Sequence, residues 1–120
     1  MQNDADNVNT LVLRLRQFAQ ERDWEAFHSP KNLAMAMMVE AGELLEHFQW
    51  LTEAQSESLS AEKRQEIELE IADVFIYLLR LSDRLNIDIV DAARRKMVIN
   101  ASKYPVEKVR GQAKKYTEYE

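Results

Sequence analysis

The sequence contains no cysteine, and only two glycines and two prolines among its 120 residues. Without cysteine, neither a disulfide nor a thiolate metal site can form, which fits a reducing compartment. The scarcity of glycine and proline leaves few residues for tight hairpin turns, whereas alanine, leucine, glutamate and arginine favour helices. The composition therefore predicts an all-α protein with one small domain.

Basic residues are also scarce relative to acidic ones, with 16 lysines and arginines against 21 aspartates and glutamates and a net charge of −5. Proteins that bind the backbone of a nucleic acid usually carry a basic excess, so we expect no nucleic-acid polymer as a partner. No apolar run reaches the roughly 18 residues of a membrane span, and the N-terminus lacks the pattern of a signal peptide. We expect a cytoplasmic protein with no membrane partner.

Hydrophobic periodicity and capping residues predict four helices. Start signals for the last three are Ser29-Pro30, Ser60 and Asp88. The expected helices cover about residues 10–22, 30–51, 61–85 and 89–103.

Four helices with short connections indicate a four-helix bundle over residues 10–105. We expect a flexible N-terminus over residues 1–9, a surface loop over 52–59 and a polar tail over 106–120. The second and third helices carry more apolar surface than one such core uses. They are therefore also expected to form a subunit interface.

Two pairs of carboxylates stand out on these same helices, Glu40-x-x-Glu43 on the second and Glu70-x-x-Asp73 on the third. Residues three apart lie on one helix face, about 60° apart at roughly 100° per residue. Both pairs lie within apolar stretches, where an ionised carboxylate is costly unless it is paired or bound to metal. Antiparallel packing of the two helices would gather all four carboxylates into one pocket.

A ligand set made only of oxygen favours a hard cation, Mg²⁺ above all, which shares its coordination with substrate phosphates. An acidic protein could bind a polyphosphate in this way, with one carboxylate positioning a water molecule for attack on phosphorus. The same spacing also occurs on solvated helices, so the residues alone leave a metal site and a structural role both open.

The residues around these carboxylates resemble the MazG-like all-α pyrophosphohydrolases, in particular their dCTP pyrophosphatase-like branch. The resemblance extends from about residue 10 to Tyr116. It rests on the carboxylate motifs, with residues 44–69 between them, and on four flanking segments. These segments are ERDWEAFHSPKNL (21–33), EAGELLEHFQW (40–50), DVFIY (73–77) and KYPV (103–106).

The resemblance implies Mg²⁺-dependent cleavage of (deoxy)nucleoside triphosphates between the α and β phosphates, releasing a monophosphate and pyrophosphate. It also implies a homotetramer built from dimers, with sites near the subunit interfaces. The catalytic metal ligands would be Glu40, Glu43, Glu70 and Asp73.

The resemblance further implies a set of residues that bind the nucleotide. The base pocket would include Trp24 and Trp50, with Tyr77 beside the metal helix, and Lys96, Asn100 and Tyr104 on the phosphate and sugar side. From the residues themselves, His28 either fastens its connector or borders the base pocket. Leu15 stands where dCTP-specific members carry a polar residue, which leaves the base open among dCTP, modified dCTP, dATP and dUTP.

Two alternatives of other classes remain at this point. A helical interaction module would explain the apolar seam of the third helix, but not the acids in apolar surroundings. A di-iron carboxylate bundle needs two Glu-x-x-His pairs and two further glutamates, and the chain offers only Glu25-x-x-His28, in a connector.

Overall fold

The computed structural model describes residues 7–118, and within that range it contains helices and no strand. This confirms the all-α class. None of these helices combines the length and the apolar character needed to cross a bilayer. The elements are α1 (Val8–Glu21), η1 (Glu25–Phe27), α2 (Pro30–Glu46), α3 (Glu53–Ser56), α4 (Ala61–Arg84), α5 (Ile89–Lys103), α6 (Val106–Val109) and η2 (Tyr116–Glu118).

The chain divides into two compact units, one ending at Ile87 and the other beginning at Asp88. The first unit contains α1 to α4, and the second contains α5, α6 and η2. The four-helix bundle and the single helical domain over residues 10–105 stay predictions, as does the subunit interface. The expected flexible N-terminus falls mostly on residues 1–6, outside the described residues.

Three predicted helix starts are confirmed by their caps. The side chains of Ser29, Ser60 and Asp88 each accept a hydrogen bond from the backbone amide three residues on, at 3.1–3.2 Å. Each bond satisfies an amide that has no partner within the helix. The helix expected over residues 89–103 has the predicted bounds.

The start of the first helix and the end of the second differ from the prediction. The first begins at Val8 rather than residue 10, because Asn7 and Thr10 form a reciprocal capping box. The second ends at Glu46 rather than residue 51. There the backbone tightens into turns, and the amide of Phe48 donates to the carbonyl of Leu45 at 2.9 Å.

Two segments that were expected to lack helix contain short ones. Within the predicted loop over residues 52–59, Thr52 and Gln55 form a capping box that starts the one-turn helix α3. The predicted polar tail contains α6 and η2. Helices this short carry no hydrophobic periodicity, which is why the pattern of the sequence does not reveal them.

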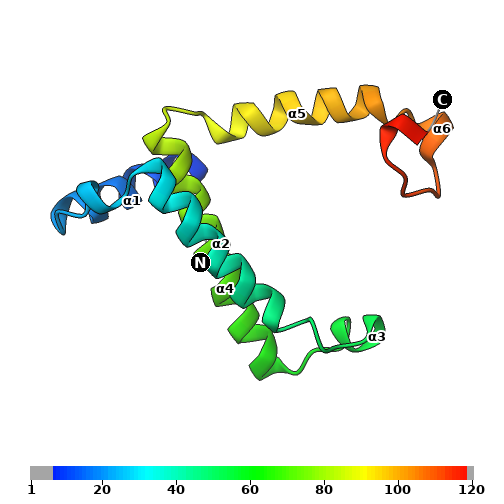
Figure 1. The fold of residues 1–120 in the computed structure, drawn as a ribbon, viewed down its shortest axis with the longest axis horizontal. Coiled ribbons are helices and arrows are strands. Elements are labelled where there is room, and N and C mark those ends of the chain that lie inside the picture. Colours follow the sequence, from blue (N-terminus) through cyan, green and yellow to red (C-terminus); the bar gives the residue numbers. More distant parts are fainter. Residues whose placement is uncertain (1–6, 119–120) are drawn as a thin grey trace. The chain divides into compact units, whose positions relative to one another are not determined.

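The first unit is organised around the pairing of α2 with α4, which lie side by side and run in opposite directions (Figure 1). Leu33 from α2 and Ile67 and Leu79 from α4 are buried, and Ala19 is the buried residue of α1. Helix α1 packs against α4. This antiparallel pairing, expected from the sequence, places the two carboxylate motifs opposite each other.

Candidate metal centre and the adjoining pocket

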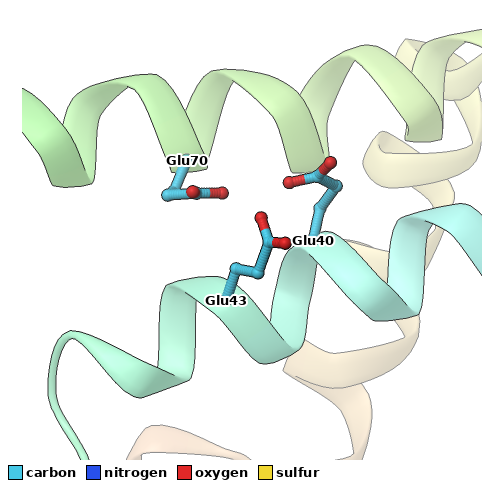
Figure 2. Close-up of side chains that lie close together, drawn as sticks. All are labelled: Glu40, Glu43 and Glu70. Carbon is cyan, nitrogen blue, oxygen red and sulfur yellow. The ribbon is translucent and has the colours of Figure 1, made fainter.

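Three carboxylates converge between α2 and α4. Figure 2 shows Glu40 and Glu43 on α2 and Glu70 on α4, with their side chains pointing toward one another. One carboxylate oxygen from each lies within 4.8 Å of the others. Glu40 and Glu70 are half-buried, whereas Glu43 is exposed. The structure thus brings together three of the four predicted ligands in one cluster, and Asp73 lies one turn along α4 from Glu70.

The electrostatics of the cluster are unfavourable for three free anions. The pKa of Glu40 is raised to about 7, chiefly by burial and then by hydrogen bonds with Glu43 and Glu70 and by the negative charges of Glu43 and Asp73. Like charges at this range disfavour ionisation, so at neutral pH Glu40 holds a proton part of the time. The cluster is therefore a place where a cation would be strongly stabilised.

Two oxygens of the cluster also lack an expected interaction. Oε2 of Glu40 and Oε2 of Glu70 are buried without a hydrogen-bond partner among residues 7–118. A buried acceptor left without a partner typically costs about 1–3 kcal/mol. Carboxylate oxygens are the ligands that Mg²⁺ prefers, and Mg²⁺ needs only a few of them because it retains waters and phosphate oxygens. The donor set therefore fits this ion.

A cavity of about 280 Å³ adjoins the carboxylates within the first unit. Its volume lies just below the range for ligand pockets, about 300–1,000 Å³, so it suits one ring system rather than a whole nucleotide. Glu40 and Asp73 form its acidic side. Its remaining lining residues are Leu15, Phe18, Ala19, Trp24, His28, Ile76, Tyr77 and Arg80.

Aromatic side chains form one side of this cavity. The ring of Phe18 meets Trp24 edge to face, with centroids 5.8 Å apart, and the ring of His28 lies 5.9 Å from Trp24. Trp24, His28 and Tyr77 are three residues that the sequence predicted to bind the nucleotide, and the fold places all three in the lining of one pocket with Asp73. Aromatic faces of this kind can stack on a base.

The other predicted nucleotide-binding residues are not in this pocket. Trp50 lies in the turn after α2, with 86% of its surface exposed, and it does not line the cavity. Lys96 and Asn100 are exposed residues of α5, and Tyr104 is half-buried at the end of that helix, all in the second unit. Their roles in binding stay predictions.

Arg80 is the charged residue of the pocket lining that the sequence did not predict. Its side chain is 3% exposed and bonds to Glu25, Asp83 and His28. In the sequence, an arginine within the apolar stretch of α4 resembles a solvated residue on the helix flank. Glu25 and Asp83 would have been the signal, since a buried guanidinium needs acidic partners.

The same contacts bear on the di-iron alternative. The Glu25 carboxylate accepts from Arg80 and from Arg84, and Nδ1 of His28 accepts from Arg80. Both side chains of the Glu25-x-x-His28 pair are therefore engaged by arginines. Cations at these positions would repel an iron ion.

Residues 35–119 match the model of the MazG-like family, a range that contains all four predicted metal ligands. The chain is 43% identical over 104 residues to dCTP pyrophosphatase 1 of Homo sapiens, and 44% identical over 104 residues to that of Mus musculus. Each match covers 85% of this chain and 61% of the relative, so the chain spans less than two thirds of the length of these mammalian proteins.

A solved structure shares the fold. The crystal structure of a pyrophosphatase from Archaeoglobus fulgidus superposes with a TM-score of 0.78 and is 40% identical in sequence. The match covers 88% of this chain and 98% of the archaeal one. Together with the family match over residues 35–119, this similarity establishes the family predicted from the carboxylate motifs. The chain belongs to the MazG-like family.

Proposed function

We propose that this protein is a Mg²⁺-dependent nucleoside triphosphate pyrophosphohydrolase, which converts a (d)NTP to a (d)NMP and pyrophosphate. The main support for this proposal is that a carboxylate cluster and an aromatic pocket adjoin each other within the first unit. The Glu40, Glu43 and Glu70 cluster suits a hard cation, and the aromatic pocket suits a base. Glu40 belongs to both, so a nucleotide could place its base in the pocket and its phosphates at the carboxylates.

The names of the relatives agree with this proposal. The mammalian proteins are called dCTP pyrophosphatases, and the archaeal neighbour is called a pyrophosphatase. We propose dCTP or a related deoxynucleotide as the substrate. Such a substrate belongs to the nucleotide pool, so we place the enzyme in the cytoplasm.

The chain's own residues would perform three tasks in this reaction. Glu40, Glu43, Glu70 and Asp73 would hold Mg²⁺, which when bound neutralises charge on the phosphates. A carboxylate of this set would orient a water molecule and accept its proton as the oxygen bonds to phosphorus. The P–O bond to the oxygen that bridges the α and β phosphates breaks, which releases the monophosphate and pyrophosphate.

We further propose that the enzyme is a homo-oligomer, a tetramer built from dimers. Support comes from large apolar side chains that remain exposed on the helices holding the carboxylates. Met35, Met38 and Val39 on α2 are 58–63% exposed, and Leu69 and Ile71 on α4 are 69% and 52% exposed. Apolar surface of this kind commonly marks an interface between protein chains. Light scattering coupled to gel filtration would contradict the proposal if it found only the 14.1 kDa monomer.

The experiment that tests the activity is a panel of the canonical dNTPs and NTPs, incubated with the full chain and Mg²⁺. The expected result is release of pyrophosphate from at least one of them, with no release when EDTA is present. The Asp73→Ala variant distinguishes an enzyme from a helical interaction module. In an enzyme the variant would lose turnover of the triphosphate while remaining folded. In an interaction module the substitution would not lower the free energy of unfolding.

A further inference from the structure

A buried arginine lies between the aromatic pocket and a group of acidic side chains. Arg80 on α4 lines the pocket, and its side chain is only 3% exposed. Nη2 donates to Oε1 of Glu25 at 3.1 Å, and Nη1 donates to Oδ2 of Asp83 at 3.3 Å. Both Nη atoms are therefore engaged by carboxylates rather than left for a substrate phosphate.

Each of the two carboxylates has a second arginine of its own. Nη1 of Arg84 donates to Oε2 of Glu25 at 2.6 Å, and Nη2 of Arg16 donates to Oδ1 of Asp83 at 2.6 Å. Replacing Arg80 would therefore leave neither acid without a cation. The two acids therefore do not need Arg80 for charge balance. Arg80 makes one further contact, with His28.

That contact determines which ring nitrogen of His28 carries the proton. Nε of Arg80 donates to Nδ1 of His28 across 3.4 Å. A ring nitrogen that accepts a hydrogen bond carries no proton, so the neutral ring must carry its proton on Nε2. The pKa of His28 is lowered, first by burial and then by the charge of Arg80, which also favours the neutral ring.

We propose that Arg80 is a positioning residue that holds His28 as an Nε2–H donor, and that this donor binds a hydrogen-bond acceptor on the substrate's base. This proposal rests on the proposed function, because it takes the nucleoside triphosphate as the ligand of the pocket. His28 lies 5.9 Å from the Trp24 ring in the pocket lining, so a base stacked on Trp24 would bring its edge near the histidine. Because Nδ1 is taken by Arg80, Nε2 is the ring nitrogen left for a ligand.

This arrangement has a consequence for selectivity. A fixed donor favours a base that presents a carbonyl oxygen or an unprotonated ring nitrogen at this point, and disfavours one that presents an amino group there. A site built around one hydrogen bond rejects a ligand that leaves the group unpaired. Arg80 would thus influence, through His28, which base is accepted.

Nitrogen NMR of the full-length protein tests the tautomer directly. The chain has only two histidines, so a His47→Gln variant assigns the His28 ring signals. We expect the shift of an unprotonated nitrogen at Nδ1 and of a protonated nitrogen at Nε2. Adding Mg²⁺ and the non-hydrolysable 2′-deoxycytidine 5′-(α,β-imido)triphosphate should move mainly the Nε2 signal. A protonated Nδ1 in the wild type would overturn the proposal.

Substitution at Arg80 tests the dependence on the arginine. In Arg80→Met we expect the two His28 signals to move toward averaged values, because both tautomers become populated. Arg80→Lys keeps the charge but lacks the Nε–H, and should show the same change if the methionine variant fails to fold. Arg84→Met is the matched control, because Arg84 also donates to Glu25 but forms no hydrogen bond with His28. In this variant His28 should keep its proton on Nε2. Unchanged signals in both Arg80 variants would contradict the proposal.

Kinetics with dCTP and Mg²⁺ separate positioning from general stability. Arg80→Met should raise KM about tenfold, the equivalent of one neutral hydrogen bond, with little change in kcat. In a His28→Ala background the same substitution should add no further effect, because Arg80 acts through His28. Additive effects in the double variant would contradict the proposal. If the wild type hydrolyses no triphosphate, the proposed function fails, whereas the NMR experiment still decides the tautomer.

Discussion

Glu40 on α2 and Glu70 on α4 point toward each other between the packed helices, and Oε2 of each is buried without a hydrogen-bond partner among residues 7–118. Leaving buried acceptors unpaired costs free energy, and so does placing like charges close together. A divalent cation would relieve both costs. The two residues therefore link the stability of the fold to the binding of metal.

This link predicts that Mg²⁺ stabilises the protein. At a concentration one hundred times its dissociation constant, an ion that binds only the folded state raises the free energy of unfolding by about 2.7 kcal/mol. Thermal unfolding with and without Mg²⁺ measures the effect. Glu70→Gln should abolish most of it, whereas Glu46→Gln, on α2 but outside the cluster, should not. Equal stabilisation of both variants would contradict the assignment.

The raised pKa of Glu40 predicts an unusual pH dependence for the metal-free protein. Its ordinary pKa is 4.5 and its folded value is about 7, so between these values the folded state binds more protons than the unfolded state. The free energy of unfolding should therefore fall as the pH rises from about 4.5 to about 7. Urea unfolding in EDTA measures this slope, and Glu40→Gln should flatten it. A slope of the opposite sign, lost in that variant, would count against the raised pKa.

The lowered pKa of Asp83 predicts that the free energy of unfolding falls as the pH is lowered. Its pKa is lowered, first by the hydrogen bond from Arg16, so its contribution to stability is present above the ordinary value of 3.8 and is lost as the pH falls through the lower folded value. Urea unfolding of Arg16→Met at neutral pH should show a lower free energy of unfolding than the wild type. The exposed pair of Arg64 and Glu68 gives a control, and Arg64→Met should cost less.

The packing of α2 predicts a contrast between two leucines of the same helix. Leu33 is 1% exposed and Leu45 is 59% exposed. Leu33→Ala should lower the free energy of unfolding by about 2–5 kcal/mol, because it leaves a cavity in the core. Leu45→Ala should cost less than half as much in the same urea titration. A loss at Leu33 as small as that expected at Leu45 would contradict the burial of Leu33.

Much of the first unit follows from local features of the sequence. Ser29 and Ser60 mark the starts of α2 and α4, and the carboxylates three residues apart share one helix face. What the sequence could not reveal depends on contacts between distant residues. Arg80 becomes recognisable as buried only when Glu25, 55 positions away, lies beside it. Trp50 is exposed and does not line the cavity of the first unit, and its role in the base pocket stays a prediction.

The most direct test of the central claim is product analysis by phosphorus NMR after incubation of the full-length protein with dCTP and Mg²⁺. The account predicts dCMP and pyrophosphate in equal amounts, and no products from a folded Glu70→Gln variant. Formation of dCDP and inorganic phosphate, or full activity in that variant, would contradict it.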